Sequence, residues 1–194
     1  MKQKSLKGTK TLKNLMEAFA GESQARNKYD YFASQAKKDG YVQIANFFTE
    51  TALNEKEHAK LWYKLINGGS VSSTKVNLRA AAAGENFEHA KMYKRMAKEA
   101  KKEGFHDIAA LFEGVASVEE QHEKRYLALL KLITSGRAFK KPKKIAWKCN
   151  NCGKIVYSTT APKVCPVCKH PQSYQEANCK CSYSLDGCTC KCNK

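Results

Sequence analysis

Two short motifs place a glutamate and a histidine three residues apart, at Glu55-x-x-His58 and at Glu119-x-x-His122. Residues three apart in an α-helix project from the same face, so each pair can bind one metal ion. Both pairs lie in largely apolar helical stripes, which contain Phe48, Thr51, Ala52 and Trp62 in the first case and Phe112, Val115, Ala116 and Tyr126 in the second. A carboxylate in such a stripe is costly unless it is paired or bound to a metal. The two motifs therefore predict metal ligands.

Two further glutamates, Glu22 and Glu85, occupy matched positions on the preceding helices, and Glu88 follows one turn after the second of them. One glutamate from each of two helices, with Glu-x-x-His from each of two others, is the dinuclear arrangement of ferritin-like bundles. Oxygen and imidazole ligands suit iron or manganese, and zinc could occupy such a site. The alternative is a polar network that only fixes the register of the helices. The candidate ligands are Glu22, Glu55, His58, Glu85, Glu88, Glu119 and His122.

The two helix pairs are not fully symmetric, because the third helix has Glu85-x-x-Glu88 where the first has Glu22-x-x-Ala25. One ion therefore has a choice of ligands that the other lacks. A carboxylate stabilises a ferric ion, whereas a neutral imidazole suits a ferrous ion. Glu88 and His58 are thus candidates to exchange on one iron as it cycles. In the alternative, Glu88 only orients another ligand.

Two tyrosines are expected to face the same interior as the glutamates. Tyr29 lies seven residues after Glu22, and Tyr93 lies eight residues after Glu85. Either they are core tyrosines with a satisfied hydroxyl, or they donate hydrogen bonds to the ligand carboxylates.

The cysteines point to a second metal site, because all nine lie after residue 148. Four of them form the motif Cys149-x2-Cys152-x12-Cys165-x2-Cys168. Four thiolates at these spacings suit zinc or a single iron in tetrahedral sulfur, and the spacing does not choose between the two. A zinc ribbon would favour a structural or nucleic-acid-binding role, and iron would favour electron transfer. A redox-capable dinuclear site in the same chain needs electrons, and this context favours iron.

The ligand-bearing helices are expected within residues 10–135, where strong helix formers dominate. Glycine-containing breaks predict four helices, which run from about 9 to 39, 41 to 67, 75 to 103, and from there to 135. Two tight turns and one longer loop connect them, which indicates an antiparallel four-helix bundle.

An internal repeat relates the two helix pairs. An offset of 64 residues matches Glu55 and His58 with Glu119 and His122, and an offset of 63 matches Glu22 with Glu85. The change of offset means that one pair contains one residue more than the other. The repeat preserves charged residues, which a purely structural repeat need not do, and it predicts two facing hairpins related by a pseudo-two-fold axis.

The chain has 194 residues and a formal net charge of +17. No apolar run approaches the ~18 residues of a membrane-spanning helix. The first twenty residues lack the apolar segment of a secretory signal, so we expect a cytoplasmic protein without a membrane partner. The expected domains are a helical bundle over 1–136, a basic linker over 137–146, a cysteine module over 147–177 and a cysteine-rich tail over 178–194.

The positive net charge is compatible with either nucleic acid or an acidic protein as a partner. The run from Lys140 to Lys144 is expected to be a solvated linker, with docking of an acidic electron donor as the alternative.

The chain resembles the rubrerythrin family. The segment Ala18-Phe-Ala-Gly-Glu22-Ser-Gln-Ala-Arg-Asn-Lys-Tyr29 is similar to the first-helix motif of that family, and Glu55-Lys-Glu-His58, Gly84-Glu85-Asn-Phe-Glu88 and Glu119-Glu-Gln-His122 resemble its other ligand motifs. Trp147-Lys-Cys149-Asn-Asn-Cys152-Gly, with Cys165-Pro-Val-Cys168, resembles its rubredoxin-like module. The resemblance covers about residues 5–177. It implies a ferritin-like diiron bundle followed by a small rubredoxin-like domain with one iron in a four-cysteine site.

The resemblance also implies a function: a non-haem diiron peroxidase that reduces hydrogen peroxide to water in the cytoplasm. Such proteins are usually homodimers or larger, and their electrons come from an NAD(P)H-dependent reductase, often through rubredoxin. A ferroxidase or iron-storage protein would need only the dinuclear site, and a zinc-ribbon nucleic-acid binder would need only the cysteine site. These two functions remain as alternatives.

The end of the chain departs from the family pattern. Its Cys-x-Cys pairs resemble metallothionein clusters, which bind soft ions through thiolates. A redox-active dithiol store and a tail with no fixed site are the other interpretations. The cysteines concerned are Cys179, Cys181, Cys188, Cys190 and Cys192.

Overall fold

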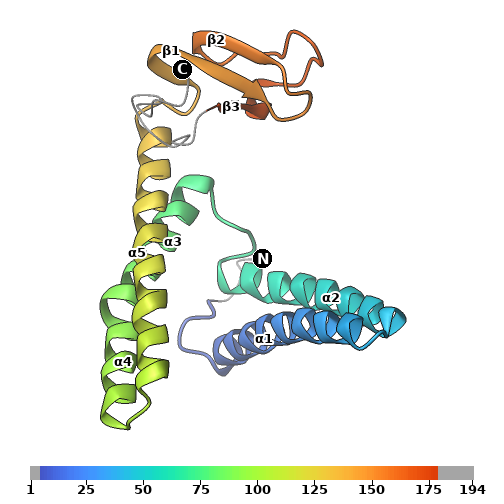
Figure 1. Ribbon diagram of the computed structural model, residues 1–194, viewed down its shortest axis with the longest axis vertical. Helices are drawn as coiled ribbons and strands as arrows, with labels where there is room; N and C mark the ends of the chain where they lie inside the picture. Colours follow the sequence, from blue (N-terminus) through green and yellow to red (C-terminus); the bar gives the residue numbers. More distant parts are fainter. Residues whose placement is uncertain (1–4, 179–194) are drawn as a thin grey trace. The chain divides into compact units, whose positions relative to one another are not determined.

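A computed structural model describes residues 5–178 of the protein, which divide into two compact units between Ser72 and Ser73 (Figure 1). The first unit contains the helices α1 (Lys10–Lys38) and α2 (Val42–Ile66). The second contains the helical segments α3 to α5 and a small sheet.

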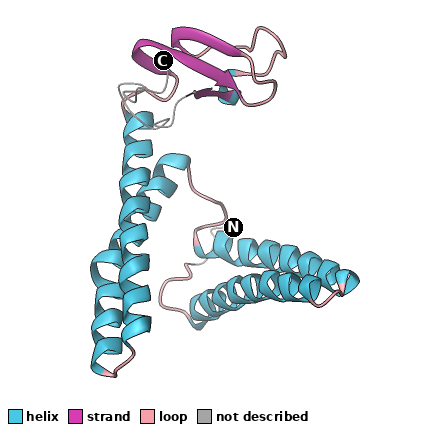
Figure 2. Cartoon of the chain, in the orientation of Figure 1, coloured by secondary structure: helices cyan, strands magenta, loops and turns pink. Residues whose placement is uncertain are grey.

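The first unit is an antiparallel helical hairpin (Figure 2). Thr9 caps α1, because its Oγ1 accepts a hydrogen bond from the backbone N–H of Leu12 at 3.1 Å. The turn into α2 passes through Gly40, whose φ of +86° is one that glycine adopts without strain. Small side chains line the contact between the helices, which allows their backbones to approach closely. The core cluster consists of Ala33, Ala36 and Ala45, with Phe48 packed against it.

The second unit repeats this hairpin. Its helical segments are α3 (Thr74–Phe87), the π-helical turn η1 (Glu88–Met92), α4 (Tyr93–Lys102) and α5 (His106–Thr134). The turn before α5 contains Gly104 with φ +85°, as Gly40 does in the first hairpin. The buried alanines Ala97, Ala100 and Ala109 lie 64 residues after their counterparts Ala33, Ala36 and Ala45. The repeat is therefore a repeat of packing as well as of sequence.

The π-helical turn explains why the offset of the repeat changes from 63 to 64. Glu85 precedes the turn and lies 63 residues after Glu22, whereas Tyr93 follows the turn and lies 64 residues after Tyr29. A π turn accommodates one extra residue in an otherwise continuous helix. The sequence predicts an uninterrupted helix over 75–103, and the structure shows the same helical run with this extra residue at Glu88–Met92.

A three-stranded antiparallel sheet follows α5. Its strands β1 (Lys140–Cys149), β2 (Ile155–Thr160) and β3 (Gln175–Ala177) lie in the order β2-β1-β3. Trp147 of β1 is fully buried, and its Nε1 donates a hydrogen bond to the carbonyl oxygen of Ser158 at 3.0 Å.

The basic run differs from the expected solvated linker, because Lys140–Lys144 lies within β1. Lys140 pairs with Thr160, and the side chain of Lys141 is buried. Lysine can bury its apolar stem in this way.

The predicted fold class is confirmed as mainly α: two antiparallel helical hairpins are followed by a small sheet that carries four cysteines. Within residues 5–178, none of the helices has both the length and the apolar character needed to cross a membrane.

Candidate metal centres

The first hairpin brings Glu22 of α1 together with Glu55 and His58 of α2. One ligand atom of each residue lies within 4.8 Å of the others. The Nδ1 of His58 lies 2.8 Å from Glu55 Oε2 and 3.9 Å from Glu22 Oε1. Two carboxylates and an imidazole in this arrangement can hold one hard or borderline divalent ion.

The second hairpin builds the same set from Glu85 of α3 and from Glu119 and His122 of α5, again with the ligand atoms within 4.8 Å of one another. The Nδ1 of His122 lies 2.6 Å from Glu119 Oε2 and 3.7 Å from Glu85 Oε1. The near-identical distances in both hairpins show that the repeat preserves the geometry of the ligands and not only their identity.

The carboxylates in each set are crowded. Burial raises the pKa of Glu22, and the adjacent Glu55 carboxyl raises it further. Burial and the adjacent Glu119 carboxyl raise the pKa of Glu85 in the same way. Carboxylates held close together in a partly buried site favour a bound cation or a shared proton. The donor atoms present thus fit divalent metal ions.

Glu88 stands at the start of η1, beside the second set. Its charge contributes to the raised pKa of Glu85. Burial, followed by the charges of Glu88 and Glu119, raises the pKa of Tyr93. Glu88 is therefore close to this set without belonging to the group of three, which is compatible with either predicted role.

The two predicted tyrosines occupy equivalent places in the two hairpins. Tyr29 packs against Phe48 with ring centroids 6.1 Å apart, and Tyr93 packs against Phe112 at 6.0 Å. Both tyrosine rings therefore pack against a phenylalanine, as expected of core tyrosines. That the hydroxyls bind the ligand carboxylates stays a prediction.

One pair beside the second set was not found by sequence reasoning. His89 of η1 and Glu123 of α5 form an ion pair in which Nε2 lies 2.7 Å from Oε2, and Asn86 also donates to Glu123. The hydrogen bonds from His89 and Asn86 lower the pKa of Glu123. The two partners are 34 residues apart, so no local spacing points to them. The repeat gives only a weak indication of this pair: the position that corresponds to Glu123 in the first hairpin is Ala59, so the charge is present in one hairpin and not in the other.

The four predicted cysteines also meet. Their Sγ atoms lie within 4.8 Å of one another, and Cys149–Cys168 and Cys152–Cys165 are each 3.6 Å apart. Cys149 and Cys165 are fully buried, whereas Cys152 is exposed. One side of the cluster therefore faces solvent.

Two similar turns hold these cysteines. The N–H of Gly153 donates to the carbonyl oxygen of Cys149 at 2.8 Å, and the N–H of Lys169 donates to that of Cys165 at 3.1 Å. Both donors have a positive φ, of +76° and +61°. Hydrogen bonds, first from the backbone N–H of His170 and then from Asn151 and the neighbouring thiols, lower the pKa of Cys168 to about 5. A thiol with this pKa is a thiolate at neutral pH and a ready metal ligand.

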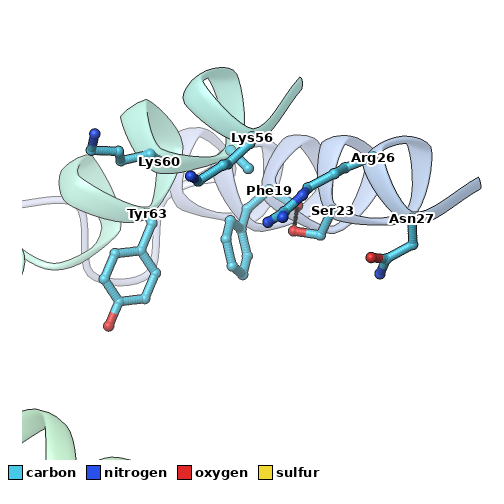
Figure 3. Close-up of a pocket in the computed structure, with 8 residues that line it drawn as sticks. Phe19, Ser23, Arg26, Asn27, Lys56, Lys60 and Tyr63 are labelled. Carbon is cyan, nitrogen blue, oxygen red and sulfur yellow. Dashed lines mark hydrogen bonds between the residues drawn. The ribbon is translucent and has the colours of Figure 1, made fainter. Parts of the chain in front are cut away.

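A cavity of about 370 Å³ lies on the α1–α2 hairpin (Figure 3). Aromatic and basic side chains line it, among them Phe19, Arg26, Lys56 and Tyr63. No carboxylate contributes to its lining, so this cavity is separate from the metal ligands of the same hairpin. The tail cysteines from Cys179 onward lie outside the described residues.

Comparisons with known proteins agree with this geometry. Residues 13–130 match the rubrerythrin family, and residues 147–176 match the rubredoxin-like domain of rubrerythrin. The chain is 52% identical to rubrerythrin of Porphyromonas gingivalis over 184 residues, which covers 89% of this chain and 92% of the relative. It is 53% identical to rubrerythrin-1 of Clostridium acetobutylicum over 188 residues, with coverage of 89% and 96%. With both modules matched and the ligand sets in place, the chain belongs to the rubrerythrin family.

Proposed function

We propose that the protein is a non-haem diiron peroxidase that reduces hydrogen peroxide to water, with electrons relayed through an iron in the four-cysteine site. The observation that carries this proposal is the presence in one chain of two matched Glu-Glu-His sets and a four-thiol cluster. A ferroxidase does not need the thiol cluster, and a zinc-ribbon nucleic-acid binder does not need the carboxylates. A peroxidase that turns over repeatedly uses both.

The dinuclear site would be held by the two sets together, with Glu88 as an additional ligand on one side. Iron bound there would polarise the peroxide oxygens as a Lewis acid and supply two electrons. The chain's own residues set up that chemistry. The carboxylates of Glu22 and Glu85 are hard oxygen donors that favour iron. Their raised pKa values also make these carboxylates better able to accept a proton from water.

Reduction of one peroxide consumes two protons as well as two electrons. Tyr93 is a candidate to orient the reacting oxygens rather than to supply these protons, because burial and the charge of Glu88 raise the pKa of its hydroxyl. The Tyr93 Oη therefore keeps its proton at neutral pH and can donate a hydrogen bond toward the site.

Electrons would enter at the exposed side of the four-cysteine cluster, near Cys152. Thiolate ligation is suited to an iron that cycles by one electron. We expect the donor to be an NAD(P)H-dependent reductase, acting directly or through rubredoxin in the cytoplasm. A basic chain with net charge +17 favours a donor with an acidic surface.

The test is a metal analysis and a stopped-flow measurement on protein purified without oxygen. The proposal predicts iron in both kinds of site and a faster reaction of the reduced protein with peroxide than with oxygen. Faster reaction with oxygen, combined with accumulation of ferric mineral, would show a ferroxidase. Zinc in the cysteine site and no iron elsewhere would show a zinc-ribbon protein.

A further inference from the structure

In the second hairpin a carboxylate bridges the two helical segments. Glu123 of α5 lies with its Oε2 2.7 Å from the Nε2 of His89, and its Oε1 accepts a hydrogen bond from the Nδ2 of Asn86 at 3.1 Å. These three residues lie between two segments of the internal repeat, so each of them has a counterpart in the first hairpin.

The first hairpin keeps this arrangement without its carboxylate. The counterparts of the three residues are Ser23 and Arg26 of α1, at an offset of 63, and Ala59 of α2, at an offset of 64. All three line the cavity of about 370 Å³ on the α1–α2 hairpin (Figure 3). A methyl group at Ala59 leaves empty the volume that a glutamate side chain fills in the second hairpin. The cavity therefore lies where the first hairpin lacks a carboxylate.

The charges around this cavity also lack an anion. Lys56 and Lys60 line it from adjacent turns of α2, where like charges four residues apart repel each other. The counterpart of Lys56 is a glutamate, Glu120, which instead pairs with a lysine at 2.6 Å. Lys60 binds Glu57, outside the cavity lining, at 2.9 Å. Within residues 5–178, no carboxylate forms an ion pair with Arg26 or with Lys56, so these two cations are available to a bound anion.

An aromatic pair forms the apolar part of the cavity. Phe19 of α1 and Tyr63 of α2 have ring centroids 5.7 Å apart, and Figure 3 shows both rings projecting to the same side of the helices. The second hairpin has Ala82 and Leu127 at the corresponding positions, so this pair belongs to the first hairpin alone. Aromatic faces of this kind offer contact area to a flat apolar group. A volume of about 370 Å³ is near the lower end for ligand pockets, which indicates a small ligand.

We propose that this cavity binds a small phosphate monoester that carries a flat apolar group. Its phosphate takes the place that the Glu123 carboxylate has in the second hairpin, beside Arg26 and Lys56, and its flat group packs against Phe19 and Tyr63. A phosphate monoester has a second pKa of about 6, so at neutral pH it is largely a dianion and balances both cations. The guanidinium of Arg26 can bind two of its oxygens at once. A carboxylate has only one charge and is expected to bind more weakly.

Calorimetric titration of the full-length, iron-loaded protein at neutral pH tests this assignment with three probes: phenyl phosphate, inorganic phosphate and benzoate. Phenyl phosphate should bind most tightly, with one molecule per chain. Phe19→Ala should remove the advantage of phenyl phosphate over inorganic phosphate and leave the binding of inorganic phosphate unchanged. Benzoate that binds as tightly as phenyl phosphate, or a wild-type protein that binds no phenyl phosphate at millimolar concentration, would overturn the proposal.

Two charge variants locate the bound probe. Ala59→Glu supplies the missing carboxylate from the chain itself and should abolish the binding of phenyl phosphate. Arg26→Gln removes one cation without adding bulk and should weaken binding by roughly tenfold or more. Arg95→Gln, outside the cavity on α4, is the matched control and should bind as wild type does. Equal affinity in wild type and Arg26→Gln would place the anion elsewhere, for example at the iron, and would overturn the proposal even if Ala59→Glu failed to fold.

Discussion

The Nε2 of His89 lies 2.7 Å from the Oε2 of Glu123, and this contact ties the π-helical turn η1 to α5. The turn also positions Glu88, which stands next to His89, and α5 carries His122 next to Glu123. The ion pair thus holds the π-helical turn, which has no counterpart in α1, beside the second ligand set.

Replacing Glu123 by Gln should destabilise the protein and loosen η1. Because the pKa of Glu123 is lowered in the folded state, the folded protein binds fewer protons than the unfolded chain below the ordinary value of 4.5. The contribution of the pair is therefore complete above about pH 4.5 and is lost as the pH falls through the folded pKa. Urea unfolding of wild type and variant at pH 7 and at pH 3 should show the difference at pH 7 only. The matched control is Glu120→Gln, which breaks the more exposed pair with Lys124 and should have a smaller effect.

Glu88 should influence the site through its charge. Glu88→Gln removes one of the carboxylates that, after burial, raise the pKa of Tyr93. The pKa of Tyr93 should fall in the variant yet stay above its ordinary value of 10, because burial and the other carboxylates remain. Ultraviolet titration of the phenolate, with Tyr93→Phe to assign the signal, measures this change. An unchanged titration would place Glu88 away from Tyr93.

If Glu88 is also the ligand that exchanges with His58, replacing it should change the redox properties of the iron-loaded protein. Glu88→Ala should raise the reduction potential of the dinuclear iron, since a carboxylate favours the ferric state. Spectroelectrochemistry measures this potential, with Glu99→Ala on the same helical run as the control. Equal potentials and equal peroxide turnover in wild type and Glu88→Ala would end the ligand-exchange hypothesis.

The crowded carboxylates should make the metal-free protein less stable as the pH rises. The pKa of Glu22 is raised in the folded state, so the folded protein binds more protons than the unfolded chain above the ordinary value of 4.5. This contribution to stability is present below about pH 4.5 and is lost as the pH rises through the folded pKa. Glu22→Gln removes the dependence, so its stability relative to metal-free wild type should increase between pH 4 and 7. Thermal melts of both proteins in chelator measure it, and a constant difference across that range would contradict the raised pKa.

The close contact of α1 and α2 predicts a large effect of a small residue. Ala45 is completely buried, and Ala45→Leu should cost about 1–3 kcal/mol because the core has no room for three more carbon atoms. The comparison is Ala20→Leu, at an exposed position of α1, which should change the unfolding free energy little. Urea denaturation of both variants and of the wild type measures these changes in unfolding free energy. Equal stabilities would mean that the hairpin is loosely packed at Ala45.

Much of the fold and of the candidate sites followed from the sequence, because the information was local. Helical spacing placed Glu55 with His58, and the repeat extended that interpretation to the second hairpin. Cysteine spacing was sufficient for the four-cysteine cluster.

What could not be predicted depends on contacts between distant segments. The His89–Glu123 pair joins two helical segments through residues that lie 34 positions apart in the sequence. Lys140–Lys144 has the composition of a solvated linker, yet β1 includes it, with Lys140 paired to Thr160 of β2. The π-helical turn is intermediate: the change of offset revealed the extra residue, but only the structure located it at Glu88–Met92.

The central claim is that the four-cysteine site feeds electrons to a dinuclear peroxidase site. Stopped-flow measurement on Cys152→Ser tests it most directly, with Val167→Ser, at an exposed position between Cys165 and Cys168, as the control. Cys152→Ser should lose reductase-coupled peroxide turnover while the chemically reduced protein still reacts with peroxide at the wild-type rate in a single turnover. Val167→Ser should retain both. Wild-type reductase-coupled turnover in Cys152→Ser would contradict the account.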